Sequence, residues 1–133
     1  MPKGHSTSGR LKSFIRDHRG TTAIEFALVA PALFTLLYGV IEFGRLLWTQ
    51  SALNFAVEEA ARCASVTPAT CGTSAQIATY AASKIATNYV PTTVFTGTTA
   101  SCGHQVNASF VYPFVVTGLM PTGPTLTATA CFP

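Results

Sequence analysis

Charged side chains are scarce in this 133-residue chain, which has eight Lys or Arg and five Asp or Glu, or 10% of its residues. About a quarter of a typical soluble domain is charged. No acidic residue follows Glu59, and the only charged residue after Arg62 is Lys84. The C-terminal half therefore has no acid for a catalytic triad or a carboxylate pair. With no HExxH and no Gly-rich phosphate loop either, we predict a protein that is not an enzyme and has no small-molecule substrate.

The positive charges are concentrated at the N-terminus. Residues 1–20 contain five Lys or Arg against one acid, Asp17, whereas the rest of the chain has three against four Glu. A nucleic-acid-binding domain needs a basic patch on a folded surface, so we predict no nucleic-acid partner. Residues 1–20 are instead predicted to be a basic cytoplasmic leader, because Lys and Arg that flank a membrane helix stay on the cytoplasmic side.

An uncharged apolar run follows the leader. Residues 26–41 contain one polar side chain, Thr35, and about 20 helical residues are enough to cross a bilayer. We predict a transmembrane helix over residues 21–48, with a kink or local unwinding at Pro31. Two alternatives are a cleaved secretory signal and the core helix of a soluble protein. The first lacks a small-x-small site after the run, and the second lacks enough other apolar surface to cover the helix.

The remaining residues, 49–133, are predicted to form a helix extension and a small exported domain. Apolar residues at three-, four- and seven-residue spacings form a stripe that continues the helix to about Ala64: Leu46, Leu53, Val57, Ala60 and Ala64. Two pairs, Glu42 with Arg45 and Glu58 with Arg62, have the spacing of intrahelical ion pairs. A capping-box spacing at Thr73 predicts a second helix over 74–89, ended by Pro91. Alternating apolar residues predict two antiparallel strands, near 106–114 and 126–132, and a weaker strand near 93–96. The fold class is therefore α+β, with a long N-terminal helix and a sheet of two to three strands.

All four cysteines lie in the exported part, which suits an oxidising compartment. They allow three pairings, of which we favour Cys63–Cys71 and Cys102–Cys131. The first closes a short local loop at the end of the long helix, and the second joins the start of one strand to the terminal strand. A metal site is disfavoured because no CxxC occurs and His104 is a lone candidate ligand, so we expect neither a metal nor a cofactor.

A carboxylate, Glu25, enters the apolar run five residues after Gly20. A charge inside a membrane helix is costly and suggests a function. The alternative is that Glu25 lies at the membrane interface and reaches the polar headgroups.

The segment from Arg19 to Arg62 resembles the TadE-like family of tight-adherence (Tad/Flp) pilus proteins. The resemblance rests on Arg19-Gly20, on AIEFAL at 23–28, on Pro31 and on EFGR at 42–45. It extends more loosely to SFVYPF at 109–114 and LTATA at 126–130.

This resemblance implies a minor pilin or pseudopilin of a tight-adherence type IV pilus, which takes part in pilus assembly and adhesion. It implies cleavage between Gly20 and Thr21 by a prepilin peptidase, which makes Glu25 the fifth and Phe26 the sixth mature residue. The major pilins of these systems usually have Tyr at the sixth place and are shorter, so the departure points to an accessory subunit.

The new amine on Thr21 can pair with the Glu25 carboxylate of a neighbouring subunit and so set their axial register. The implied partners are the bacterial inner membrane, the peptidase, other pilins and the assembly platform. The alternative function is an uncleaved single-pass anchor that presents a small extracytoplasmic binding domain.

Overall fold

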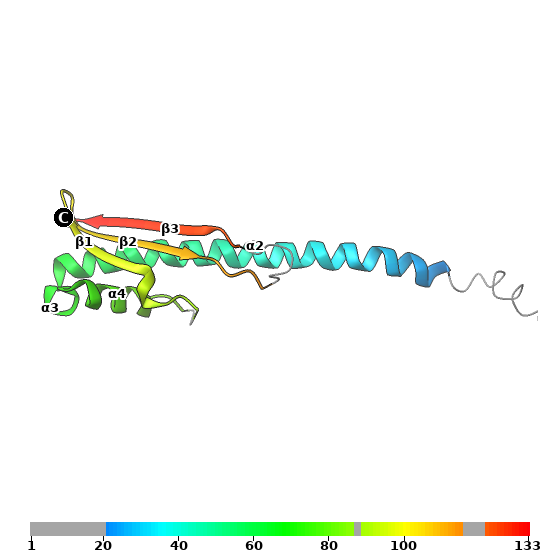
Figure 1. Ribbon diagram of the computed structural model, residues 1–133, viewed down its shortest axis with the longest axis horizontal. Coiled ribbons are helices and arrows are strands. Elements are labelled where there is room, and N and C mark those ends of the chain that lie inside the picture. The colour runs from blue at the N-terminus through cyan, green and yellow to red at the C-terminus, as the bar shows by residue number, and fades with distance from the viewer. Residues whose placement is uncertain (1–20, 87–88, 116–121) are drawn as a thin grey trace, which may run out of the picture. The chain divides into compact units, whose positions relative to one another are not determined.

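A computed structural model describes residues 21–86, 89–115 and 122–133 of the chain, so the leader at 1–20 lies outside the described residues. The chain divides into two compact units, residues 1–40 and 41–133. The elements in order are α2 (Thr21–Val66), α3 (Pro68–Cys71), α4 (Ser74–Ser83), the 3-10 turn η2 (Thr92–Val94), β1 (Phe95–Ala100), β2 (Gly103–Val111) and β3 (Thr125–Phe132). The predicted α+β class is confirmed (Figure 1).

Helix α2 is a single helix of 46 residues that includes both the predicted membrane segment and its extension. Pro31 lies inside it, and the residues on both sides of the proline are helical, so the predicted local unwinding does not occur. The Thr35 hydroxyl donates to the Pro31 carbonyl over 2.8 Å, which adds a side-chain bond to the turn that follows the proline. A proline removes one backbone hydrogen bond, and a helix of this length keeps its remaining bonds around the gap.

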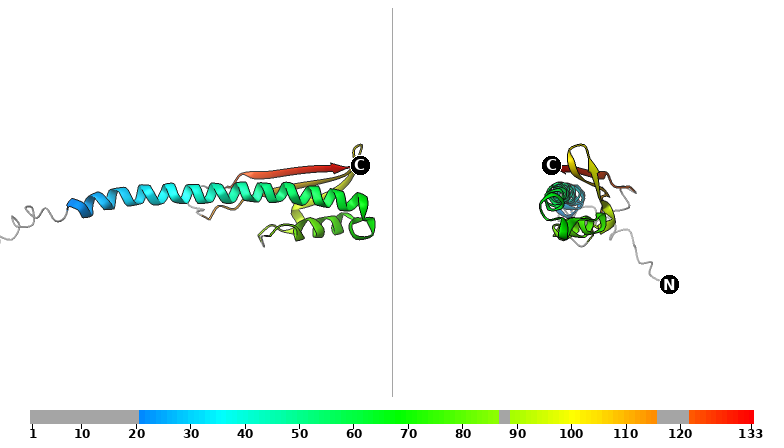
Figure 2. Two further views of the ribbon diagram at one scale, coloured as in Figure 1. Left: turned by 180° about the vertical axis from the view of Figure 1, so that it is seen from behind. Right: turned by 90° about the vertical axis from the view of Figure 1, so that its left-hand side faces the viewer.

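The C-terminal part of α2 contributes one face to the core of the second unit. Its buried residues recur at helical spacing, and Leu53, Val57, Ala60 and Ala64 all come from the predicted stripe. The sheet and α4 pack around this part of the helix from two sides (Figure 2). Ile77 and Ala81 of α4, Ile85 after it, and Val106 and Phe110 of β2 complete the same cluster.

Helix α4 begins as predicted and ends earlier. The capping box is present, because the Gln76 N–H donates to Thr73 Oγ1 and the Thr73 N–H donates to Gln76 Oε1. The helix ends at Ser83 and not at Tyr89, as predicted from Pro91. The Lys84 N–H bonds to the Ala81 carbonyl, three residues back, which tightens the last turn.

The sheet has three antiparallel strands in the order β1-β2-β3. Its first strand begins two residues later than predicted and runs to Ala100, while Thr92–Val94 form the 3-10 turn before it. Alternation places Val106, Ala108 and Phe110 of β2 on the buried face, with Leu126 and Ala128 of β3. The two C-terminal strands form the predicted antiparallel pair, but β2 begins at Gly103 and ends at Val111, whereas the prediction placed it near 106–114.

Two disulfides, Cys63–Cys71 and Cys102–Cys131, tie the ends of these elements together, with Cα–Cα distances of 5.8 and 6.2 Å. They are the pairings that the sequence favoured. Cys102 sits in the two-residue turn between β1 and β2, which Gly103 closes. Gly103 has a φ of 117°, and a Cβ there would collide with the Phe132 carbonyl oxygen, so this position requires glycine.

Candidate functional site

The first part of α2 exposes an unusual amount of apolar surface. A window of 18 residues in this helix has a mean hydropathy of 2.0, and none of its residues is buried. Its exposed large apolar side chains include Ile24, Phe26, Leu28, Val29, Leu33, Phe34, Leu36, Leu37, Tyr38 and Val40. Contiguous apolar exposure on this scale marks a surface that another apolar phase covers. By length and composition, α2 is therefore a candidate membrane span.

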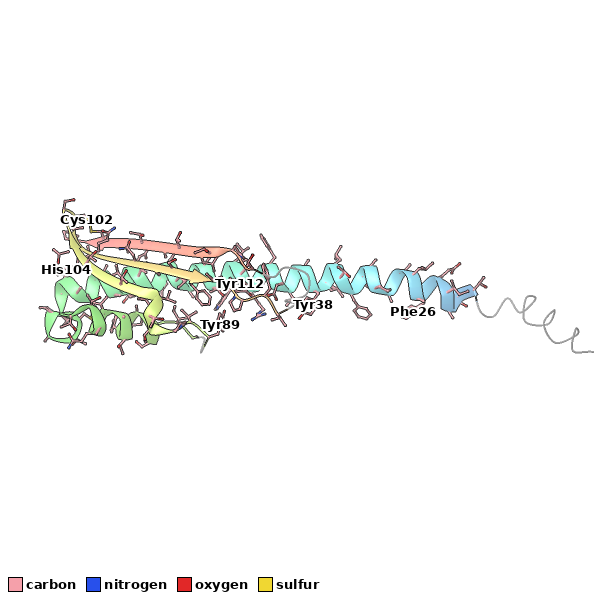
Figure 3. The ribbon with its side chains drawn as sticks, viewed as in Figure 1. Phe26, Tyr38, Tyr89, Cys102, His104 and Tyr112 are labelled. Carbon is pink, nitrogen blue, oxygen red and sulfur yellow. A yellow bond between two sulfur atoms is a disulfide. The ribbon has the colours of Figure 1, made fainter. Side chains whose placement is uncertain are left out.

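The predicted assembly residues lie at the start of this helix. Thr21 is its first residue, and Gly20 lies outside the described residues. Glu25 is exposed. Phe26, which Figure 3 labels near the start of the helix, is 72% exposed. Within residues 21–86, 89–115 and 122–133, the ion pair of the structure is between Arg45 and Glu42, so Glu25 has no cationic partner in that set.

A second carboxylate, Glu42, lies at the start of the second unit and is only 9% exposed. Its Oε2 accepts a hydrogen bond from Arg45 Nη1 over 3.1 Å. Its Oε1 accepts a hydrogen bond from the backbone N–H of Val115, also over 3.1 Å. Both oxygens of this carboxylate are therefore engaged within the chain, which removes much of the cost of its burial.

Three further polar side chains surround this pair, and together they form what we call the Glu42 cluster: Glu42, Arg45, Thr49, Tyr89 and Tyr112. Thr49 Oγ1 donates to the Arg45 carbonyl over 2.9 Å, so the Tyr89 hydroxyl, 2.7 Å away, donates to Thr49 Oγ1. Figure 3 shows Tyr89 and Tyr112 beside the middle of α2. The cluster joins the helix to the segments before β1 and after β2.

Tyr112 is fully buried, and its hydroxyl is the buried side-chain atom without a hydrogen-bond partner in the described part of the chain. Burial raises the pKa of this hydroxyl above its ordinary value. The positive charge of Arg45 opposes that rise, and Glu42 and Tyr89 add to it. Tyr112 therefore remains neutral at physiological pH.

Sequence reasoning found the Glu42–Arg45 spacing but missed the rest of this cluster. The sequence does contain a signal for the burial of Glu42, because this residue lies four, seven and eleven residues before Leu46, Thr49 and Leu53. Those positions share one helix face, so Glu42 belongs to the inward stripe. Its partner Val115 is 73 residues away and carries no sequence signal for the contact.

Other polar side chains of α2 and β2 have simpler surroundings. Gln50 Nε2 donates to Asn54 Oδ1 and to the Thr127 carbonyl of β3. Glu58 and Arg62, which were expected to pair along the helix, are both exposed and form no ion pair within the described residues. His104 is a half-buried residue of β2 that faces Thr99 of β1 and Phe132 of β3 in the sheet register.

Residues 20–62 match the sequence profile of the TadE-like protein family. The matched segment begins at Gly20 and includes Glu25, Phe26 and the Glu42–Arg45 pair, so the predicted resemblance is confirmed over about a third of the chain. TadE-like proteins are structural components of pili and not an enzyme family. No curated protein and no solved structure matches the chain.

Proposed function

We propose that this chain, whose N-terminal helical segment is TadE-like, is a minor pilin or pseudopilin of a tight-adherence type IV pilus. The observation that carries the proposal is the first part of α2. It is a long helix with exposed apolar side chains and a single exposed acid, Glu25, near its N-terminal end. Such a helix needs either a bilayer or the packed helices of other subunits around it.

Processing is the first step of the proposed function. A prepilin peptidase cuts between Gly20 and Thr21, after which the basic leader is lost and α2 begins the mature chain. Gly20 suits this position because the absence of a Cβ lets the peptidase approach the backbone closely. The new amine on Thr21 has a reference pKa of about 7.7–8.0, so it is mostly protonated at neutral pH.

Assembly is the second step. In the bilayer, the Glu25 carboxylate lies at the end of the apolar run without a cation in the described residues of its own chain. The protonated amine of Thr21 on a neighbouring subunit is a partner of the right charge. Glu25 lies four residues beyond Thr21, or about 6 Å along the helix axis, so pairing sets the axial offset between subunits. Burying an unpaired carboxylate in an apolar environment costs free energy. Other axial offsets would leave Glu25 unpaired, so this cost favours the offset that pairs it.

Location and partners follow from this account. The leader is cytoplasmic, the first part of α2 (residues 21–48) crosses the inner membrane, and residues 49–133 lie outside the cytoplasm, where both disulfides form. The partners are the prepilin peptidase, the assembly platform and other pilins, and the mature protein enters the pilus or its assembly complex. An uncleaved membrane anchor that presents residues 49–133 is the competing function, because α2 alone is consistent with it.

Two substitutions in the native host separate these functions. Gly20→Val should block cleavage and leave membrane insertion intact. Glu25→Gln should leave cleavage largely intact and abolish incorporation into pili, because an amide cannot balance the neighbouring ammonium group. The matched control is Glu58→Gln, which removes an exposed acid of the same helix. Wild-type pilus number and incorporation with Glu25→Gln would reject the pairing role.

A further inference from the structure

Five large apolar side chains, each more than half exposed, lie around α2 at the start of the second unit. We call them the apolar rim: Ile41, Phe43, Leu47, Trp48 and Val115. Four of them belong to two turns of α2. At about 100° of rotation per residue, Phe43, Leu47, Trp48 and Ile41 occupy roughly half of the helix circumference. Val115 adds to the opposite side, because its N–H is bonded to Glu42 on the inward face.

The charges at this level of the helix are already neutralised within the chain. Glu42 and Arg45 form an ion pair, and the second oxygen of the carboxylate accepts the Val115 N–H. Here the acid is 9% exposed, whereas the apolar residues around it are 52–68% exposed. Exposed apolar side chains around a buried, internally paired carboxylate are typical of a surface that does not face water.

The distance of the apolar rim from the start of α2 indicates its depth in a bilayer. Helix from Thr21 to Ile41 rises about 30 Å, which is the thickness of the hydrocarbon core. The rim begins where that core ends. Trp48 lies seven residues further, about 10 Å along the axis, at the depth of the headgroup layer, where tryptophan is enriched in membrane proteins. Phe55 is also exposed but lies another seven residues away, beyond this layer.

We propose that the apolar rim seats the second unit on a phospholipid bilayer, with Trp48 in the headgroup layer and Ile41 at the edge of the hydrocarbon. The internal pairing of Glu42 lets this carboxylate lie at the lipid surface without binding an outside cation. Arg45, which is about 40% exposed on its side chain, can extend toward lipid phosphates. This inference rests on the membrane span in the proposed function, and it is independent of cleavage and of the role of Glu25.

The chain offers a direct probe, because Trp48 is its only tryptophan. The full-length chain is reconstituted into phosphatidylcholine vesicles in which the lipid is brominated either near the headgroup end or near the methyl end of its acyl chains. Bromine quenches tryptophan emission only at close range. We expect strong loss of Trp48 emission with the first lipid and weak loss with the second.

A matched variant keeps one tryptophan and moves it along the same helix face. Trp48→Phe combined with Phe55→Trp places the probe beyond the rim, and both positions are exposed, so folding should be preserved. We expect its emission to be insensitive to both brominated lipids and similar to that of a water-exposed tryptophan. The disulfides, checked by thiol labelling, report that the variant is folded.

Three outcomes overturn the inference. Equal quenching of Trp48 and of a tryptophan at position 55 means that the helix lies deeper in the bilayer than we propose. Quenching of Trp48 mainly by the methyl-end label places it in the hydrocarbon. Emission of Trp48 that is blue-shifted but insensitive to bromine, and that changes on dilution of the protein in the vesicles, means that a second copy of the chain covers the rim. The proposed function fails separately, through an uncut N-terminus, whatever the quenching shows.

Discussion

The Oε1 atom of Glu42 accepts a hydrogen bond from the backbone N–H of Val115 over 3.1 Å, although 73 residues separate the two. This bond fastens the segment after β2 to α2. The same carboxylate holds Arg45 on the next helical turn. A buried acid of the TadE-like segment therefore organises a part of the chain that the family match does not reach.

Removing this acceptor should destabilise the second unit. Glu42→Ala leaves the Val115 N–H without its partner and the Arg45 guanidinium without its acid, and we expect a loss of about 1–3 kcal/mol in the free energy of unfolding. Glu42→Gln keeps an oxygen for the N–H and loses only the ion pair with Arg45, whose side chain is 40% exposed, so its cost should be no more than about 1 kcal/mol. Denaturant unfolding of the purified chain in detergent, followed by near-UV circular dichroism, measures both.

Amide hydrogen exchange supplies the local readout for the same variants. In Glu42→Ala, the Val115 amide should exchange much faster than in the wild type, whereas amides of β2 paired with β3 should change less. Glu58→Gln is the control, because that exposed acid has no such contact and its removal should shift stability by no more than about 0.5 kcal/mol. Unchanged protection at Val115 in Glu42→Ala would show that the bond is not formed in solution.

Two tyrosines of the Glu42 cluster should respond in opposite ways to loss of the hydroxyl. Tyr89→Phe removes a hydrogen bond to Thr49 and should cost about 1 kcal/mol. Tyr112→Phe removes a buried hydroxyl that has no partner in the described residues, so stability should be unchanged or higher by up to about 1 kcal/mol. Denaturant unfolding of both variants under the same conditions measures this difference. Equal destabilisation by the two variants would contradict the hydrogen bonding described for the two hydroxyls.

Alkaline solution should weaken the wild-type fold through Tyr112. Burial raises the pKa of this hydroxyl above the value of about 10 that it has in an unfolded chain. The resulting stabilisation is complete below pH 10 or so and is lost as the pH rises through that value toward the folded-state pKa. Tyr112→Phe should therefore lose less stability than the wild type between neutral and strongly alkaline pH. Coincident pH profiles of the two proteins would refute this.

The two disulfides should differ in their contribution to stability. Their sequence separations are 8 and 29 residues. The loop-entropy relation then gives about 2.5 kcal/mol for Cys63–Cys71 and about 3.6 kcal/mol for Cys102–Cys131. The paired Cys→Ala variant that lacks Cys102–Cys131 should therefore lose more stability than the one that lacks Cys63–Cys71. Thiol labelling of the oxidised wild-type protein should find no free cysteine. A larger loss from the Cys63/Cys71 variant would contradict the entropic ranking.

Local patterns predicted much of this fold because they report local physics. The apolar stripe of Leu53, Val57 and Ala60 predicted the buried face of α2, and the alternation around Val106 predicted β2. The capping box at Thr73 marked the start of α4 correctly. Each of these signals depends on residues within a few positions of one another, so one sequence is enough to find them.

Signals failed where distant contacts decide the structure. Pro91 suggested a helix to Tyr89, but the chain leaves the helix at Ser83, and Tyr89 lies against Thr49 of α2. The strand β1 was displaced in the prediction because Gly97, whose absent side chain leaves room for Ile77, interrupts the apolar alternation. The Glu42–Val115 bond depends on chain segments that only the tertiary fold brings together.

The mature N-terminus tests the central claim most directly. The protein is purified from membranes and from sheared pili of its native host, and its N-terminal peptide is identified by mass spectrometry. The account predicts a chain that starts at Thr21, with the leader absent, in both fractions. An intact leader that includes Gly20, or a chain that starts beyond the apolar run at Ile41, would contradict the proposal that this protein is a processed pilin.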